Sequence, residues 1–357
     1  VACFGESHGR CVGVVVDGCP AGLPLSEKDI QKEIDKRIPP KTEIVSARRE
    51  KDIVEVLSGT FNDFTTGSPI CTLVWNKEVI SGEYDLIKDT PRPGHADYPA
   101  RIKYGSFNDY RGGGRFSGRK TVAFVMAGAV ARKLLGLFGV EVLAYTIEIG
   151  KVKLRTMPTL EKIRRNTYKT AVRCPDLESE KEMEEAILKA KREGDSVGGI
   201  VECVASNVPV GIGEPLFDSL DAYIAKMLFD VPAVKGVEFG AGFEAARLKG
   251  SENNDQYVLR GGKIVTLTNN AGGILGGLSC GMPILVRVAI KPTPSISKEQ
   301  KTVNLSKMEE TLIRVKGRHD PCVVPKAVPV IESAVAIVLV DHMLRAGFIP
   351  KLLGGQT

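Results

Sequence analysis

Two stretches of the 357-residue chain contain the same order of predicted elements, and this repeat constrains the fold more than any other feature of the sequence. An alignment that places Pro20 on Pro209 also places the run VGVVV (12–16) on VECVA (201–205). Gly22 and Gly211 then fall at the same point of the following turn. Because β-branched runs closed by Gly and Pro are typical of strands, each copy predicts a strand, a turn and then a helix.

Each copy also predicts one helix that is apolar on most faces. Residues 121–137 (TVAFVMAGAVARKLLGL) and 328–346 (VPVIESAVAIVLVDHMLRA) have this pattern, which is typical of a buried helix. Each follows a Gly/Arg segment, which contains Arg115 in the first half and Arg318 in the second. Chance could account for either pair alone, but two pairs in the same order favour a duplication. The sequence therefore favours a duplicated α/β (α+β) fold in a single domain, 1–357, with halves at about 1–175 and 195–357.

The other elements follow from local patterns. Ser26 and Asp29 have the spacing of a capping box, which predicts the start of a helix. Its apolar stripe continues through Ile34 and Ile38 until Pro39-Pro40 ends it. Further elements are expected at 54–57 (strand), 284–290 (strand) and 176–193, a charged surface helix inserted near the joint of the two halves.

Composition excludes several classes of protein. Hydrophobic residues make up 43% and charged residues 26% of the chain, the usual balance of a folded globular protein, so a disordered chain, a collagen-like fibre and a small disulfide scaffold are excluded. The net charge of +6 permits an anionic small ligand as readily as nucleic acid.

The cysteines and apolar runs bear on location. The eight cysteines are dispersed, with no Cys-x-x-Cys and no metal-ligand pairing with the four histidines, so we expect reduced thiols, no metal site and a cytoplasmic protein. The longest apolar candidate, 333–340, lies between Glu332 and Asp341 and is shorter than the roughly 18 residues of a membrane span, so no membrane association is expected. The chain begins at Val1 without Met, which leaves a preceding targeting segment open.

One short motif fits a hydrolase. Residues 5–9 (GESHG) match the Gly-x-Ser-x-Gly nucleophile elbow, which would make Ser7 the nucleophile of a serine hydrolase. Position argues against it, because only four residues precede the motif, whereas several strands precede the nucleophile in that fold. The hydrolase remains a minor alternative.

Two of the four histidines lie in glycine-flanked loops. His8 is in GESHG, and His95 is in RPGHAD (92–97), where Pro and Gly disfavour regular structure. Acidic and basic neighbours make both candidates for acid–base chemistry near neutral pH. His342 lies inside the apolar helix and is assigned to packing or to an interface.

Arginines cluster beside glycines in both halves. Fixed guanidinium groups next to exposed backbone N–H groups suit a phosphate or a carboxylate. An RNA-binding Gly/Arg segment is the alternative, but aromatic residues are only 6% of the chain and do not interleave with the arginines. A compact polyanionic ligand fits better, and no nucleic acid partner is expected. The segments concerned are 48–49, 111–115, 119–120 and 317–320, with a Pro-rich ordered loop, KPTPS, at 291–295.

Several segments taken together resemble the chorismate synthase family. They are, in chain order, FGESHG (4–9), RPGHAD (92–97), DYRGGGRFSGRKT (109–121), DSVGG (195–199), NAGGILGG (270–277) and GRHDPC (317–322). The resemblance implies a large β-α-β sandwich with an internal pseudo-twofold repeat, and a homotetramer. It implies the anti-1,4-elimination of phosphate from 5-enolpyruvylshikimate 3-phosphate to give chorismate, the last step of the shikimate pathway. It also implies reduced FMN as cofactor, with NADPH as a possible reductant.

The resemblance also implies roles for individual residues. His8 would protonate the departing phosphate, and His95 would supply or hold a proton beside the flavin ring. Asp320, in a relay with Ser7, would help to remove the ring hydrogen. The implied flavin contacts are Arg115, Phe116, Ser117, Ala233, Gly276, Lys291, Pro292, Thr293, Pro294, Ser295 and Arg318; the implied substrate contacts are Arg37, Arg48, Arg49 and Arg119.

The match to the family pattern is incomplete at three positions. Glu43 stands where many members have Arg, so one anion contact is in doubt. Phe116 stands where Ser is common, and Pro232 where Asn is common. None of the three departures removes a residue to which a catalytic role is assigned.

Overall fold

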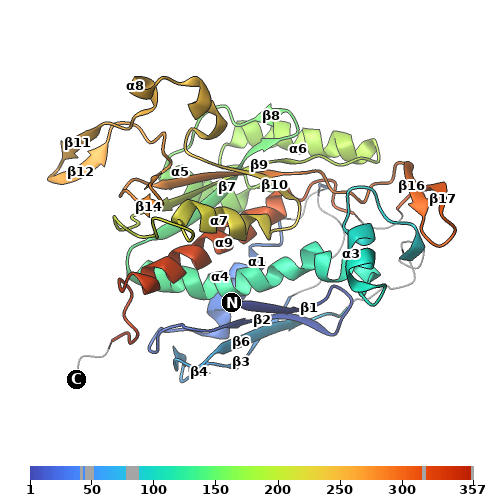
Figure 1. Cartoon of the computed structure of the whole chain (residues 1–357), viewed down its shortest axis with the longest axis horizontal. Coiled ribbons are helices and arrows are strands. Elements are labelled where there is room, and N and C mark those ends of the chain that lie inside the picture. Colours follow the sequence, from blue (N-terminus) through green and yellow to red (C-terminus); the bar gives the residue numbers. More distant parts are fainter. Residues whose placement is uncertain (41–42, 45–51, 78–87, 316–318, 355–357) are drawn as a thin grey trace.

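Two antiparallel sheets enclose a layer of helices in the computed structural model, which describes residues 1–40, 43–44, 52–77, 88–315 and 319–354 (Figure 1). The strands of the first sheet lie in the order β1 (Ala2–Gly5), β2 (Cys11–Val16), β6 (Ile70–Trp75) and β3 (Val54–Ser58). Those of the second lie in the order β10 (Val234–Phe239), β15 (Ile284–Ile290), β9 (Gly199–Ser206), β7 (Glu141–Ile149) and β8 (Val152–Lys153).

The helical layer consists of α1 (Glu27–Asp35), α4 (Thr121–Leu137), α7 (Leu220–Phe229) and α9 (Val324–Arg345). The helix α4 packs on β2 and on α9, and α9 in turn packs on β7 and β9 of the second sheet. Because each of the two helices has a sheet on one side and the other helix on the opposite side, their side chains are buried almost all round. The predicted β-α-β sandwich is confirmed.

The internal repeat is visible in the order of elements. In chain order, β1, β2, α1, β3, β6 and α4 of the first half correspond to β7, β9, α7, β10, β15 and α9 of the second. The strand neighbours correspond too, because β1-β2-β6-β3 matches β7-β9-β15-β10 and all these pairs are antiparallel. The repeat in the predicted fold is confirmed, whereas the assignment of the chain to one domain with halves near 175 and 195 stays a prediction.

Smaller elements decorate the sandwich. The charged helix α6 (Leu177–Arg192) and α5 (Leu160–Asn166) lie in the connection from β8 to β9, on the outer side of the second sheet (Figure 1). The remaining helices and strands are α3 (Asp97–Tyr104), α8 (Gly250–Asn253), β4 (Thr60–Phe61), β5 (Phe64–Thr65), β11 (Tyr257–Arg260), β12 (Lys263–Thr266), β13 (Ile274–Leu275), β14 (Leu278–Ser279), β16 (Gln300–Asn304) and β17 (Glu309–Ile313).

Element boundaries depart from the sequence predictions in two places. The capping box of α1 is confirmed, since Asp29 Oδ2 accepts from the Ser26 N–H at 2.8 Å. The helix nevertheless ends at Asp35, and Ile38 is half-exposed instead of extending the apolar stripe. The second difference is that α9 begins at residue 324 instead of 328, because Pro325 fits the first helical turn, where no N–H is needed.

The long helix α9 also qualifies the expectation about membranes. Among the described residues it is the one helix whose length and apolar composition would suit a membrane span. The expectation from the sequence was based on residues 333–340 alone, which are too few for a span. Most of α9 is buried inside the sandwich. Its buried Glu332 carboxylate receives hydrogen bonds from Arg132 of α4 (2.7 Å) and from the Tyr168 hydroxyl (2.7 Å), which compensates the charge.

We predict that Gly128→Ala destabilises the protein by about 1–3 kcal/mol, because the added methyl overpacks the contact between α4 and α9. A Cβ at residue 128 would lie 2.2 Å from Ser333 Cβ. Urea unfolding measures the loss. Gly136→Ala is the control on the same helix, where a Cβ meets nothing within 4 Å, and that variant should be at least as stable as the wild type. Equal changes in both variants would contradict the proposed close packing.

Candidate active site

The GESHG segment forms the connection between two antiparallel strands. Ser7 and His8 follow β1 and precede β2, and both side chains are buried. A nucleophile elbow requires a strand followed by a helix, and its serine needs a base within hydrogen-bond reach. Among the described residues, Ser7 Oγ has no hydrogen-bond partner. The serine hydrolase interpretation is therefore wrong for this structure.

A turn of three glycines brings the two loop histidines together. Gly112, Gly113 and Gly114 have φ values of +58°, +81° and +49°, which side chains rarely adopt. A Cβ at Gly112 would lie 2.2 Å from His8 Nδ1, and a Cβ at Gly113 would lie 3.1 Å from His95 Nε2. The two imidazoles thus pack against adjacent residues of one turn, which needs glycine both for its backbone conformation and for this close approach.

We predict that Gly112→Ala abolishes most activity, because the methyl would occupy the space of the His8 ring. The matched control is Gly261→Ala in the β11–β12 turn, where φ is +55° and a Cβ meets nothing within 4 Å. Both variants carry the left-handed strain of about 1 kcal/mol, but only the first displaces a histidine. Turnover by the two purified proteins is compared; equal turnover would show that the position of His8 is unimportant.

Asp97, the first residue of α3, holds His95 in place. Its Oδ1 lies 2.6 Å from His95 Nδ1, and Arg92 donates to both of its oxygens at 2.8 Å. Burial alone would raise the pKa of the Asp97 carboxyl, but hydrogen bonds from Arg92 and His95 outweigh burial and hold that pKa well below its ordinary value. The ionised carboxylate orients the imidazole, with Nε2 toward Gly113.

The Pro-rich loop 291–295 adjoins the His95 loop. Arg92 donates to Ser295 Oγ at 3.1 Å, and the Lys291 ammonium donates to the carbonyl of Gly94. Ser196, of the DSVGG segment, donates to the Thr293 carbonyl at 2.7 Å. The loop is therefore held by hydrogen bonds to both the His95 loop and the DSVGG segment, and it is ordered, as its composition predicts. Thr293 Oγ1 is buried and has no partner within the described part of the chain. This hydroxyl is a donor available to a ligand, in the same loop as Lys291.

Two of the implied substrate arginines share one carboxylate. Arg37 Nη1 lies 3.2 Å from Asp52 Oδ2, and Arg119 Nη1 lies 2.5 Å from Asp52 Oδ1. Arg37 also donates to Thr121 Oγ1 at 3.0 Å, which places this cluster at the N-terminal end of α4. Burial lowers the pKa of Arg37 to about 10, although Asp52 opposes the shift, so the guanidinium stays charged at neutral pH. These side chains point into the protein, unlike the exposed arginines of an RNA-binding segment.

Asn76 connects the arginine cluster to the His8 loop. Its Oδ1 accepts from Arg119 Nε at 3.0 Å, while its Nδ2 donates to the carbonyls of Glu6 (3.0 Å) and Gly9 (2.8 Å). One amide therefore fixes a guanidinium and both ends of the segment that carries His8.

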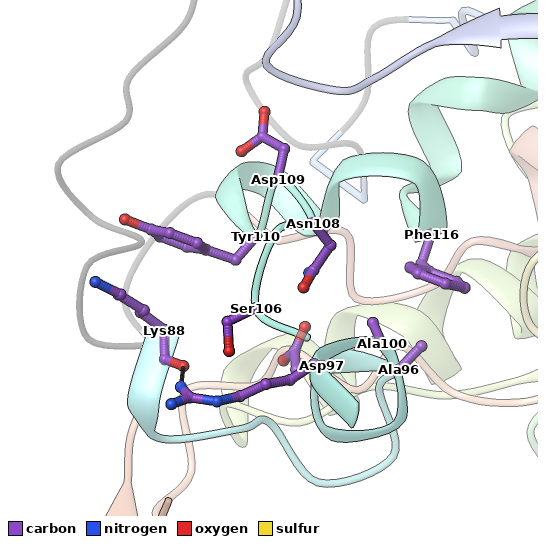
Figure 2. Close-up of a pocket in the computed structure, with 11 residues that line it drawn as sticks. Lys88, Ala96, Asp97, Ala100, Ser106, Asn108, Asp109, Tyr110 and Phe116 are labelled. Atoms are coloured by element: carbon purple, nitrogen blue, oxygen red, sulfur yellow. Dashed lines mark hydrogen bonds between the residues drawn. The ribbon is translucent and has the colours of Figure 1, made fainter. Parts of the chain in front are cut away.

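A cavity of about 40 Å³ lies behind the glycine turn (Figure 2). Asp97, which bonds His95 on one side, faces this cavity on the other, and Phe116 closes one end of it. The Phe116 ring lies 6.4 Å from that of Tyr104, so the aromatic residue at this atypical position packs against α3. The lining is completed by Lys88, Ala96, Ala100, Arg101, Ser106, Asn108, Asp109, Tyr110 and Gly113.

Other predicted site residues are placed less directly. Asp320 pairs with Lys326 of α9 at 2.6 Å, and the next residue, Pro321, accepts from the Val197 N–H, which links Asp320 to the 291–295 loop through the DSVGG segment. Its relay with Ser7 stays a prediction. Ala233, at φ +75°, accepts from the Lys291 N–H at 2.9 Å. Arg115 is exposed, and Ser117 Oγ accepts from the Arg119 N–H.

Some predicted residues are not brought to this site. Gly276 lies in the turn between β13 and β14, at the opposite end of the helical layer from α3 (Figure 1). Arg48, Arg49 and Arg318 lie outside the described residues. His342 is buried, as predicted, and packs edge-on against the Tyr223 ring with the centroids 5.3 Å apart.

Sequence reasoning missed Asp52, Asn76 and Asp97. Asp97 could have been found, since it shares the RPGHAD segment with His95 and a carboxylate near a candidate acid–base histidine commonly orients it. No local signal marks Asp52 or Asn76, because their partners lie far away in the chain.

Two histidines on one glycine turn, beside a pair of buried arginines, are side chains with which an enzyme can transfer protons and bind an anionic group. A family model described as chorismate synthase matches residues 1–344. The chain belongs to the chorismate synthase family.

The similarity to named relatives covers nearly the whole chain. A chorismate synthase of Dehalococcoides mccartyi is 54% identical over 353 residues, covering 99% of this chain and 97% of the relative. One from Korarchaeum cryptofilum is 55% identical over 343 residues, covering 96% and 95%. A crystal structure of chorismate synthase superimposes with a TM-score of 0.74 at 32% identity, covering 99% of this chain and 92% of the other. These likenesses confirm the family and the fold inferred from the motifs.

Proposed function

We propose that this protein is a carbon–oxygen lyase that converts 5-enolpyruvylshikimate 3-phosphate to chorismate, the last step of the shikimate pathway. In this anti-1,4-elimination the C–O bond to phosphate and one ring C–H bond break. The electron pair of the C–H bond enters the ring as the double bond shifts, and the C–O pair leaves with phosphate, so there is no net oxidation. The observation that carries the proposal is the glycine turn that holds His8 and His95 at adjacent positions.

The residues present suit reduced FMN as the cofactor. The Lys291 ammonium and the unpartnered, buried Thr293 hydroxyl offer a positive charge and a hydrogen-bond donor to a phosphate-bearing group. Lys291, Thr293 and Ser295 would hold the flavin near His95, since Ser295 and His95 both contact Arg92. When bound, the reduced flavin supplies an electron-rich ring that promotes the C–O cleavage.

The chain's own groups then bind the substrate and manage its protons. Arg37 and Arg119 bind an anionic group of the substrate at the start of α4, where the helix dipole also favours negative charge. His8 gives a proton to the departing phosphate, a task suited to an imidazole near neutral pH. His95, oriented by Asp97, holds a proton beside the flavin, and Asp320 assists removal of the ring hydrogen.

Assembly and location are part of the proposal. The family resemblance favours a homotetramer in the cytoplasm, with NADPH as the candidate reductant of the flavin. Sedimentation equilibrium measures the first of these, and a spectral titration with NADPH under anaerobic conditions measures the last.

An anaerobic assay tests the function. The wild-type protein, supplied with chemically reduced FMN and 5-enolpyruvylshikimate 3-phosphate, is expected to release phosphate and chorismate in equal amounts. A titration with oxidised and reduced FMN, followed by the flavin spectrum, shows whether the protein is loaded. Flavin-loaded, folded protein that yields no chorismate would overturn the proposal.

A further inference from the structure

The carboxylate of Asp52 lies between two cations that the proposed function assigns to the substrate. Its two oxygens accept from different arginines, Oδ2 from Arg37 and Oδ1 from Arg119. The side chains of Asp52 and Arg119 are each 8% exposed, and that of Arg37 is 15% exposed. This buried group of three charges has a net charge of +1.

The backbone of Asp52 is fixed from the helical layer. Gln31 of α1 donates from Nε2 to the Asp52 carbonyl at 2.8 Å and accepts at Oε1 from the Val54 N–H at 3.0 Å. Because α1 packs on α4, the carboxylate is held at a set place relative to the start of α4. Gln31 thereby ties Asp52 to the rigid part of the fold.

Arg37 keeps a donor for a ligand after it binds Asp52. Arg37 Nε is buried and has no hydrogen-bond partner within the described ranges. Arg119 is held a second time by Asn76, the residue that also fixes the His8 loop. The arginine pair is therefore positioned relative to the His8 loop by two hydrogen bonds of 3.0 Å through Asn76.

A carboxylate beside an anion site would repel the anion if charge were its only effect. Removing such a carboxylate would then tighten ligand binding. If instead the carboxylate sets the positions of the two guanidinium groups, its removal weakens binding, because like charges repel and the fork-shaped donors lose their alignment. The two roles predict changes of opposite sign.

We propose that Asp52 is a positioning residue that holds Arg37 and Arg119 as a pair for one anionic group of the substrate. This inference rests on the proposed function. It assigns to Asp52 no contact with the substrate.

A double-mutant cycle tests the proposal through binding. The dissociation constant of 5-enolpyruvylshikimate 3-phosphate is measured by calorimetry, without flavin, for the wild type, Asp52→Asn, Arg119→Ala and the double variant. Asp52→Asn is expected to weaken binding by about 10-fold or more, as when one partner of a buried charge pair is lost. The double variant should bind within about 3-fold of Arg119→Ala, because without Arg119 there is no guanidinium pair for the carboxylate to align.

Control variants distinguish the loss of arginine positioning by Asp52 from a general loss of folding or stability. Glu141→Gln removes a carboxylate that pairs with Arg164 at the surface (2.7 Å) and should leave the dissociation constant unchanged. If Asp52→Asn does not fold, Asp52→Glu, which keeps the charge, takes its place and is expected to raise KM more than it lowers kcat. Unchanged or tighter binding by the Asp52 variant, or independent effects in the double variant, would overturn the proposal.

The test also distinguishes the two levels of inference. Wild-type protein that binds the substrate but does not turn it over would refute the proposed function, while the binding cycle would still decide the role of Asp52. Wild-type protein that does not bind the substrate would refute both.

Discussion

His8→Ala is expected to lower kcat by about 100-fold or more, the usual contribution of a general acid, without loss of the fold. The His8 ring is buried in the β1–β2 connection and packs against Gly112, with the arginine pair linked to its loop through Asn76. A water molecule can replace the missing imidazole as proton donor only poorly. The anaerobic release of phosphate measures kcat, and circular dichroism checks the fold.

A second substitution distinguishes the loss of proton transfer by His8 from the loss of a polar side chain at this position. His8→Asn keeps a hydrogen-bonding side chain but has no proton to exchange near neutral pH. It should be as slow as His8→Ala. Wild-type kcat in either variant would refute the role of His8.

Asp97→Asn is expected to impair both catalysis and stability. The substitution leaves the buried Arg92 guanidinium without its carboxylate, so the free energy of unfolding should fall by about 3–5 kcal/mol. Turnover should fall by about 100-fold, because His95 loses the carboxylate that orients it. His95→Ala is the comparison: it should lose as much turnover but far less stability, since the Arg92–Asp97 pair remains.

The pH dependence of stability reports on the same carboxylate. Its pKa in the folded protein is held below that in the unfolded chain, which is about 3.9. The stabilisation is therefore fully present above about pH 4 and is lost as the pH falls toward the folded-state pKa. Urea unfolding between pH 3 and pH 7 should show a shallower acid loss in Asp97→Asn than in the wild type. Identical pH profiles in the two proteins would contradict the network.

The elements of the core could be predicted because their signal is local. The helix α4 and the strand β15 have the predicted bounds, since runs of apolar residues with clear stops define both. The errors lie at ends: Ile38 falls beyond α1, and α9 starts at a Pro-containing turn that a periodicity argument does not include. Hydrophobic periodicity does not show which strands are neighbours in a sheet. The repeat indicated only that both halves contain the same order of elements.

The candidate site could be predicted only where motifs are local. His8 and His95 were identified by their loops, yet nothing in the sequence shows that they pack against adjacent glycines of one turn. Asp52 and Asn76 were missed because their hydrogen-bond partner Arg119 is far away in the sequence, and such contacts produce no local sequence pattern. Gly276 matches a family motif, but it lies in the turn between β13 and β14, and β14 is at the opposite side of the molecule from α3 (Figure 1).

A crystal structure of the protein with oxidised FMN and 5-enolpyruvylshikimate 3-phosphate is the most direct measurement. We expect the phosphate of the substrate within hydrogen-bond distance of His8 Nε2 or Nδ1, an anionic group on Arg37 and Arg119, and the flavin between His95 and the 291–295 loop. Substrate bound at another surface, with both histidines away from either ligand, would contradict the assignment of this site.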